Sequence, residues 1–311
     1  MLKYTIRRLL LIIPTLFVVL LITFTLAHFA PGSPWDAKSE GRRQDPQIVE
    51  NLNKKFGLDK PVPEQFVTYL WSAVRGDFGV SMTFRDRQVS DIVGEAFPKS
   101  AQLGIQAILL AVAVAVPLGV ISALKQNSVV DYGALLFATA GYAIPSFVLA
   151  IFFIYVFSVT LHLLPSGGWG GGNLRNLVMP TVLLAIGASA FLARITRASM
   201  LEAIRQDYVR TARAKGLREQ VVVTSHILKN ALIPVVTVLG PATAGIITGT
   251  FFIEQIFAIP GLGRYFVNSI LARDYPLILG VYLLYALIIS VANLAVDLVY
   301  GMLDPRIKVG T

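Results

Sequence analysis

The sequence predicts an all-α integral membrane protein with six transmembrane helices. First, its composition is too apolar for a soluble domain: of 311 residues, 55% are hydrophobic and 14% charged, and the mean hydropathy is +0.67. Soluble domains are roughly 45–50% apolar and 25% charged. Second, the apolar residues gather in runs of about the ~20 residues that cross ~30 Å of hydrocarbon. The runs cover 9–30, 101–124, 133–160, 178–198, 231–255 and 277–300.

The interiors of these runs favour membrane helices over buried soluble ones. There is no charged residue within 101–124 or 231–253. Pro117, Pro145 and Pro241 lie inside runs, and membrane helices tolerate proline where neighbouring helices satisfy the freed carbonyl groups. The first run is longer than the apolar part of a signal peptide, so we expect it to be retained.

Basic residues beside the runs predict that both termini are cytoplasmic. Lys and Arg concentrate in the N-terminal tail, in the segment 194–230 and in the C-terminal tail, whereas the opposite short loops hold only Arg175, Arg264 and Arg273. This bias sets orientation, and long loops translocate largely regardless of charge. We therefore expect a multi-pass membrane protein with six spans and both termini in the cytoplasm.

The loop 31–100 is then extracytoplasmic. Two short amphipathic helices are expected within it, over 46–57 and 62–75, because apolar residues recur there every four positions. The predicted apolar faces are Ile48, Leu52 and Phe56 in the first helix and Phe66, Leu70 and Val74 in the second. The loop is either a cap packed on the helix bundle or a docking surface for an extracytoplasmic partner.

Several functional classes are disfavoured. The net charge of +9 comes from short pieces between runs rather than from a basic stripe, which argues against nucleic-acid binding. The chain has no cysteine, and its three histidines show no metal-ligand spacing. The glycine-rich segment 167–172 lacks the Lys-Ser/Thr ending of a phosphate-binding loop, so a flexible turn or a partner-contact loop is the better interpretation.

Charged residues lie at the ends of the runs rather than at their centres. Glu254 ends the fifth run, Asp297 lies near the end of the sixth, and Arg194 and Arg197 end the fourth. A proton- or sodium-coupled carrier usually places ionisable groups near the midplane. A self-contained secondary carrier is thus weakened but stays an alternative, and we expect energy for transport to come from another chain.

The segment 199–235 holds a short basic helix. Leu201, Ile204, Tyr208 and Ala212 are spaced to share one helical face, and Gly216 is placed to end the helix as a left-handed C-cap. Two interpretations remain open. The helix either lies on the anionic inner leaflet or is presented to a cytoplasmic partner.

This segment also carries a family resemblance. DYVRTARAKGL (207–217) and HILKNALIP (226–234) resemble the cytoplasmic loop of binding-protein-dependent ABC importer permeases, in the oligopeptide/dipeptide/nickel group and most closely its B-type subunits. Further matching motifs follow in order along the chain: APGSP (30–34), FGLDKP (56–61), GDFGVS (76–81), LKQN (124–127), IPSF (144–147), LPSGGW (164–169), RITRASM (194–200), GIITGT (245–250), PGLG (260–263), RDYP (273–276) and DPRI (304–307).

The resemblance implies a type-1 ABC importer permease fold. It places a cytoplasmic tail and first helix at 1–30, an extracytoplasmic loop subdomain at 31–95, the transmembrane domain at 96–303 and a cytoplasmic tail at 304–311. The implied function is that of a permease subunit, half of the translocation pathway of an oligopeptide importer, and the implied location is the plasma (inner) membrane of a prokaryote. Dipeptide, nickel, glutathione or sugar oligomers are the alternative cargoes.

The implied partners are a second permease subunit, two ATPase subunits that use ATP and Mg²⁺, an extracytoplasmic substrate-binding protein, the peptide and the lipid bilayer. The chain itself is expected to bind no cofactor, to use no metal and to catalyse no reaction.

The resemblance also implies site residues. A coupling helix within 202–217 would contact the ATPase through Glu202, Arg205, Asp207, Tyr208, Arg210, Thr211, Ala212, Arg213, Lys215 and Gly216. Aligned on Gly216, the E-A-A positions of the general importer loop hold Arg210, Thr211 and Ala212, so its glutamate is absent. Loops 31–100, 161–177 and 256–276 would meet the binding protein, with Gly167, Gly168, Trp169 and Gly170 as candidate contacts.

Overall fold

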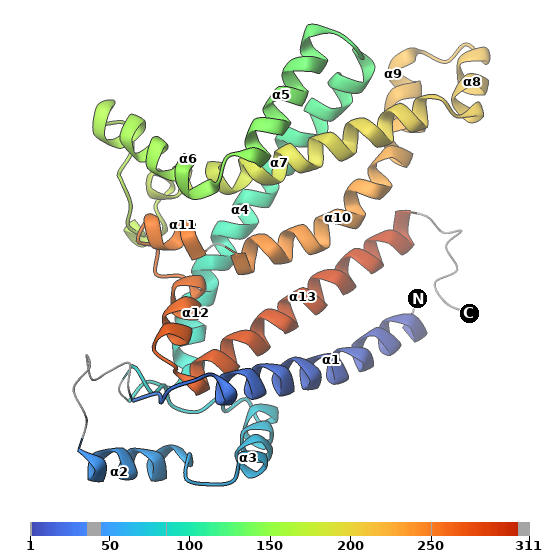
Figure 1. Ribbon diagram of the computed structural model, residues 1–311. Coiled ribbons are helices and arrows are strands. Elements are labelled where there is room, and N and C mark those ends of the chain that lie inside the picture. The colour runs from blue at the N-terminus through green and yellow to red at the C-terminus, as the bar shows by residue number, and fades with distance from the viewer. Residues whose placement is uncertain (1, 36–44, 85, 250, 304–311) are drawn as a thin grey trace. The chain divides into compact units, whose positions relative to one another are not determined.

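The computed structural model describes residues 2–35, 45–84, 86–249 and 251–303, and the predicted tail 304–311 lies outside them. In these ranges the chain is helical apart from loops and an isolated bridge between Val80 and Gln88, so the predicted all-α class is confirmed (Figure 1). The helices are α1 (Leu2–Phe29), α2 (Pro46–Phe56), α3 (Val62–Val74), α4 (Val89–Leu124), α5 (Val129–Ala143), α6 (Ser146–Phe153), α7 (Leu174–Ile204), α8 (Asp207–Ala214), α9 (Glu219–Val221), α10 (Leu228–Gly249), α11 (Phe251–Ile256), α12 (Leu262–Leu271) and α13 (Tyr275–Leu303). Two π-helical segments, Ile154–Thr160 and Val222–Ile227, continue α6 and precede α10.

Among the described residues, 5 helices are long and apolar enough to cross a membrane, or up to 6 if one bent pair is counted as a span. The bent pair is the predicted third span, which is not a straight helix: α5 and Ser146–Thr160 meet at 100°. Ile144, with φ −85° and ψ 121°, is extended at the break. Pro145 explains this conformation, because a proline ring disfavours the helical region for the residue before it.

The chain divides into two compact units. One comprises Met1–Thr5, Ala101–Ile259 and Val291–Thr311, and the other Ile6–Ser100 and Pro260–Ser290. The first contains α5 to α11 and the second contains α2, α3 and α12, while α1, α4 and α13 each contribute residues to both.

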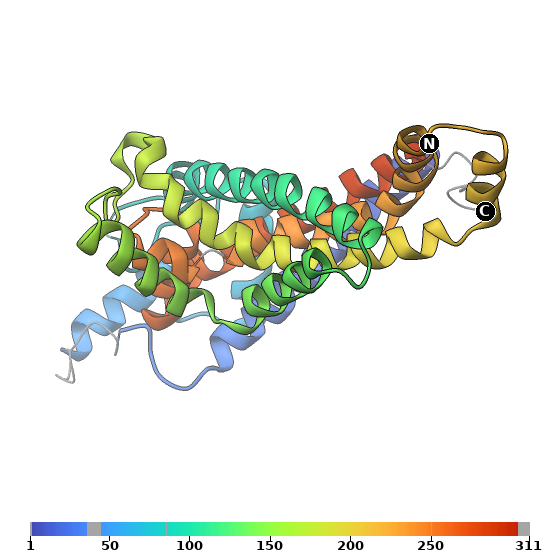
Figure 2. The ribbon, with the colours of Figure 1, turned by 90° about the horizontal axis from the view of Figure 1, so that it is seen from above.

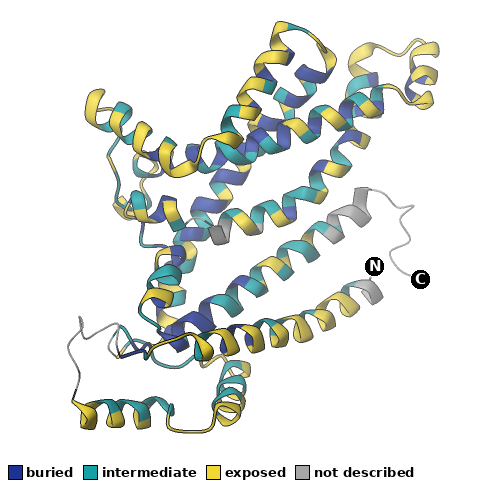
Figure 3. Ribbon diagram, in the orientation of Figure 1, coloured by how far each residue is buried: buried dark blue, intermediate teal, exposed yellow. Residues whose placement is uncertain are grey.

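In the first unit, α7 is the central helix. It packs against α5, α6 and α10, and buried positions recur along its length (Figure 3). Small residues bring its neighbours close: a Cβ on Gly119 of α4 would lie 2.7 Å from the Ala193 carbonyl oxygen, and one on Gly141 of α5 would lie 3.1 Å from the Ala190 Cβ. Close packing at small residues is the usual way in which membrane helices associate.

A buried ion pair also joins α5 to α7. Arg197 donates from Nε to Asp131 Oδ1 at 2.6 Å and from Nη2 to Oδ2 at 2.7 Å. Ser122 of α4 donates to the same carboxylate, and so does the backbone N–H of Asn127 at 2.9 Å. The pair therefore fixes the ends of three helices at one place.

In the second unit, the beginning of α13 is held by the segment that precedes α4. Asp274 is fully buried. Its carboxylate accepts hydrogen bonds from the Ser81 hydroxyl and from the backbone N–H groups of Thr83 (2.9 Å) and Leu277 (3.2 Å). Because its side chain accepts from the N–H of Leu277 in the first turn of α13, Asp274 is the N-cap of that helix.

Other motifs meet in the same unit. Arg273 donates from Nη1 to the Ser33 carbonyl oxygen at 3.1 Å, and the guanidinium occupies the space that a Cβ on Gly32 (φ +101°) would need. The backbone N–H of Leu262, which begins α12, donates to Ser100 Oγ at 2.7 Å. The sequence motifs around Gly32, Leu262 and Arg273 thus lie where hydrogen bonds or close contacts join distant segments of this unit.

The two helices expected in the loop after the first span are present, with partly different faces. In α2, Leu52 and Phe56 pack inward with Val49, while Ile48 is exposed. In α3, Phe66 and Leu70 pack inward, but Val74 is exposed. Ile48 and Val74, at the ends of the two predicted apolar faces, therefore lie outside the packed side of each helix.

Candidate functional site

The first candidate site is the short helix α8, which follows α7 at one end of the first unit (Figures 1 and 2). The segment 202–217 is not one helix. α7 ends at Ile204, and Gln206 is extended, with φ −74° and ψ 149°. α8 then begins at Asp207, whose acidic side chain suits the positive end of a helix. The sequence contains no Gly or Pro at this break, so the break was not predicted.

The break changes which residues of α8 face the protein. Val209 and Ala212 are buried, three positions apart, whereas Tyr208 is 40% exposed. The predicted shared face of Leu201, Ile204, Tyr208 and Ala212 is therefore wrong at Tyr208. That face assumed uninterrupted helical spacing, and Gln206 interrupts it.

Val209 and Ala212 anchor α8 to other helices. They belong to a buried cluster with Met200 and Ala203 of α7, and with residues of α4, α10 and the π-helical segment before α10. This cluster consists of Ala123, Met200, Ala203, Val209, Ala212, Val222, Ile227 and Ala231. Val209 is not among the residues predicted from the sequence. The signal for it is an apolar residue three positions before Ala212, on the same face of the helix.

Gly216 ends this element as predicted. Its φ of +73° is left-handed, and a Cβ there would meet nothing within 4 Å. The Gly216 N–H donates to the Arg213 carbonyl at 2.9 Å, and the Leu217 N–H donates to the Ala212 carbonyl at 3.4 Å. These two bonds form a Schellman motif, in which glycine is favoured because it lacks a Cβ.

Ion pairs lie on the exposed side of α8. Arg213 binds Glu219 through two hydrogen bonds, of 2.6 Å from Nη2 and 3.1 Å from Nε. This carboxylate raises the pKa of Arg213 above its usual value. Arg210 lies 3.5 Å from Asp207, and both are largely exposed, so this pair adds little stability.

Most of the predicted coupling residues are on the surface. The exposed ones are Glu202, Arg205, Asp207, Tyr208, Arg210, Thr211, Arg213, Lys215 and Gly216, and Ala212 is the buried one. The result is a short helix with one side packed on the π-helical segment Val222–Ile227, in a buried cluster shared with α4, α7 and α10, and a mainly cationic side exposed.

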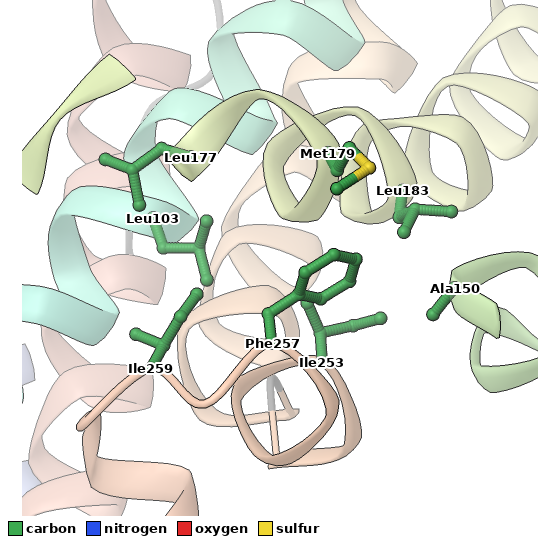
Figure 4. Close-up of a cluster of buried hydrophobic side chains, with 8 residues drawn as sticks. All are labelled: Leu103, Ala150, Leu177, Met179, Leu183, Ile253, Phe257 and Ile259. Carbon is green, nitrogen blue, oxygen red and sulfur yellow. The ribbon is translucent and has the colours of Figure 1, made fainter. Parts of the chain in front are cut away.

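The second candidate site is the glycine-rich loop before α7. It is packed rather than loose: the Gly168 N–H donates to the Phe257 carbonyl at 2.7 Å, and the Gly167 carbonyl accepts from Asn176 Nδ2 at 3.1 Å. Trp169 packs against the buried cluster around Phe257, whose members Figure 4 shows. Gly170, with φ +54°, is exposed. The loop is therefore anchored at Gly167 and Gly168, and its interpretation as a contact surface stays a prediction.

The glycines are needed for this packing. A Cβ on Gly167 would lie 2.8 Å from the Phe257 carbonyl oxygen, and one on Gly170 would lie 2.5 Å from Asn176 Oδ1. At Gly167 the two backbones approach too closely for a larger residue, whereas at Gly170 the close atom belongs to a side chain and the positive φ of +54° is what favours glycine. Among the described residues, no group of three or more His, Asp or Glu side chains is arranged to hold a metal ion.

The described residues thus form a helical bundle with several helices long and apolar enough to cross a membrane, joined at one end to a short cationic helix, which is the architecture of an integral membrane protein. The chain belongs to the family described as "Binding-protein-dependent transport system inner membrane component", which residues 115–309 match. Residues 1–104 match the corresponding N-terminal family. This chain is a multi-pass protein of the bacterial inner membrane.

Relatives agree over the whole length. The oligopeptide transport system permease protein OppB of Salmonella typhimurium is 44% identical over 308 residues, covering 99% of this chain and 100% of that one. The dipeptide transport system permease protein DppB of Bacillus subtilis is also 44% identical, covering 99% and 98%. The predicted resemblance to the peptide-permease group and its B-type subunits is confirmed.

The fold also resembles a solved structure. A chain of the MetNI methionine ABC transporter, in inward-facing conformations, matches with a TM-score of 0.56 at 17% identity, covering 68% of this chain and 96% of that chain. At this identity the likeness concerns the fold alone. Family membership confirms that the chain is a permease component and not an enzyme, and permease subunits of this family bind no cofactor.

Proposed function

We propose that this chain is one permease subunit of an ATP-driven peptide importer and that α8 is the contact through which cytoplasmic ATPase subunits move it. Relatives named for oligopeptide and for dipeptide transport are both 44% identical to it. This supports peptides as the cargo over nickel, glutathione or sugar oligomers. Membership in a binding-protein-dependent family supports the importer over a self-contained carrier.

The observation that carries the coupling role is the attachment of α8. Val209 and Ala212 pack on the π-helical segment before α10, in a buried cluster that also holds residues of α4, α7 and α10, while Arg210 and Arg213 are exposed. A short helix held in this way moves as a rigid body with its neighbours. Its guanidinium groups suit an acidic groove on an ATPase, because Arg forms charge-assisted bonds with carboxylates.

The proposal also includes an orientation in the membrane and the other partner proteins. α8 and both termini lie in the cytoplasm, and residues 96–303 form the transmembrane domain. A second permease subunit completes the pathway. The loop 31–100 and Gly170, which is exposed beside Trp169, face an extracytoplasmic binding protein. The stretch from Leu174 to Ile204 supports this separation, because 31 residues of helix extend about 46 Å, more than the ~30 Å of hydrocarbon.

Charge reversal on α8 tests the coupling. In the complete transporter, purified through a tag on this chain and placed in liposomes, we expect Arg210→Glu with Arg213→Glu to reduce both ATP-driven peptide uptake and peptide-stimulated ATP hydrolysis at least tenfold. The reason is that two charge-assisted contacts are each worth about 1.5–3 kcal/mol.

Lys125→Glu is the matched control, because Lys125 is an exposed cation at the end of α4 and outside α8. We expect near-normal hydrolysis and uptake from it. If the double variant assembles and still shows normal peptide-stimulated hydrolysis, α8 is not the coupling contact.

A further inference from the structure

The helix α3 is apolar on its exposed side. Glu64 is its one charged residue, at the first turn. Val67, Trp71 and Val74 are 62%, 60% and 73% exposed and lie on one side of the helix. A surface helix in water carries polar residues on its outer face, and a continuous exposed apolar patch marks a contact with a partner or a membrane.

The neighbour of α3 shows which medium surrounds it. The Phe66 ring packs edge-on against Phe24 of α1 at 5.2 Å and against Phe17 at 5.9 Å between centroids. Both phenylalanines lie within the candidate span Thr5–Phe29, and at 1.5 Å per residue they are about 8 and 18 Å from its end. Phe17 is itself exposed. The outer side of α3 therefore continues the exposed apolar surface of a candidate membrane span.

A pocket of about 510 Å³ opens between α1, α3 and α13. Its lining is apolar and includes Leu16, Leu20, Leu70, Ala73 and Leu283. Because an apolar lining cannot form hydrogen bonds with a polar ligand, this pocket favours a hydrocarbon chain.

A second pocket, of about 440 Å³, adjoins the first at Phe78, which lines both. Lys54, Lys55 and Lys60 line it together with one carboxylate, Asp77. Lys54 and Lys60 form exposed pairs with Glu50 and Glu64. Such pairs are weak, so the lysines can exchange these partners for an anion.

The Tyr69 hydroxyl lines this second pocket and is buried without a hydrogen-bond partner. Burial, with a smaller effect from Asp77, raises the pKa of Tyr69 above its usual value. The hydroxyl therefore keeps its proton and is a donor. A buried donor without an acceptor is costly, and a ligand oxygen would satisfy it.

We propose that α1, α3 and α13 bind a phospholipid of the bilayer, with an acyl chain in the apolar pocket and the phosphate in the adjoining pocket near Tyr69 and the lysines. The apolar pocket is continuous with the exposed apolar surface of α1, and three lysines complement the negative phosphate. The lipid would hold α3 in the leaflet that surrounds the C-terminal end of α1, near Phe29.

Photo-crosslinking tests the site in the full-length chain, in nanodiscs of phosphatidylethanolamine and phosphatidylglycerol. The probe is a phosphatidylglycerol with a diazirine on one acyl chain, and the crosslinked peptides are identified by mass spectrometry. We expect crosslinks concentrated on residues 66–74 and 280–287. Ala73→Phe, which fills the apolar pocket, should lower the yield there about tenfold.

Val67→Phe is the matched control, because it adds similar bulk to α3 outside both pockets; its yield should stay within about twofold of the unmodified chain. Tyr69→Phe removes a hydroxyl that has no protein partner, so the fold should be unaffected. Loss of one charge-assisted bond should reduce retained phospholipid about tenfold after detergent washing.

Crosslinks spread evenly over all exposed apolar faces, with no effect of Ala73→Phe, would overturn the proposal. Crosslinks to another protein chain in place of lipid at α3, in the assembled transporter, would overturn it as well and show a protein interface there. Unchanged phospholipid retention in Tyr69→Phe would exclude the assigned headgroup position.

Discussion

At the scale of single residues, the Asp131–Arg197 pair is the clearest polar feature of the first unit. Asp131 is almost fully buried, and Arg197 is partly buried. Removing ions from water is costly, and two-point pairing with added hydrogen bonds offsets that cost. Deleting one partner leaves the other charge uncompensated, which is more harmful than deleting both.

We therefore expect Asp131→Asn to destabilise the chain by about 3 kcal/mol. Arg197→Gln combined with Asp131→Asn should cost less than the sum of the two single changes. Thermal unfolding of the four forms in one detergent measures this coupling. Additive effects would show that the two side chains do not act as a pair.

Arg197 was predicted as a charge at the end of a span, but its partner was not. The two residues are 66 positions apart, and only the packing of α5 against α7 brings them together. Hydropathy locates a charge along a span. It gives no information about which charge on another helix lies beside it.

At the scale of elements, prolines show how far the sequence predicts helices. Pro145 breaks the third span, yet Pro180 of α7 and Pro241 of α10 lie inside helices, as Pro117 does in α4. A proline weakens a helix in every case, and the neighbouring helices decide whether it breaks. The existence of the spans was therefore predictable, but the position of the bend was not.

The end of α8 gives a test at this scale. Gly216→Val should cost about 1–2 kcal/mol locally, because a β-branched residue is strained at φ +73°. No neighbouring atom opposes a side chain there, so the effect comes from backbone conformation. Peptide uptake should fall more than the amount of protein inserted in the membrane.

Gly216→Asn is the control, because Asn adopts left-handed conformations more readily than other non-glycine residues. Uptake should be intermediate between that of glycine and that of valine. Equal losses of insertion and uptake in the valine variant would indicate that Gly216 supports folding alone and has no part in transport.

At the scale of the whole molecule, the family motifs serve structural roles that the sequence alone did not suggest. The segments around Gly32, Ser81 and Asp274 meet in the second unit through hydrogen bonds over more than 190 positions. The motifs indicate the family from the sequence alone. Their roles could not be predicted, because each depends on a partner from a distant part of the chain.

The break at Pro145 has a consequence for the bilayer itself. α5 has 15 residues, and Ser146–Thr160 has 15 as well. Each half is about 22 Å long, less than the ~30 Å of hydrocarbon. A span bent by 100° is thus subject to hydrophobic mismatch, which a thinner membrane relieves at fractions of a kcal/mol per Å. We expect peptide uptake in liposomes to decline as the lipid acyl chains lengthen, and a flat dependence on chain length would contradict this. The thickness of the membrane would then regulate the rate of transport, independently of the ATPase chains that are proposed to supply the energy.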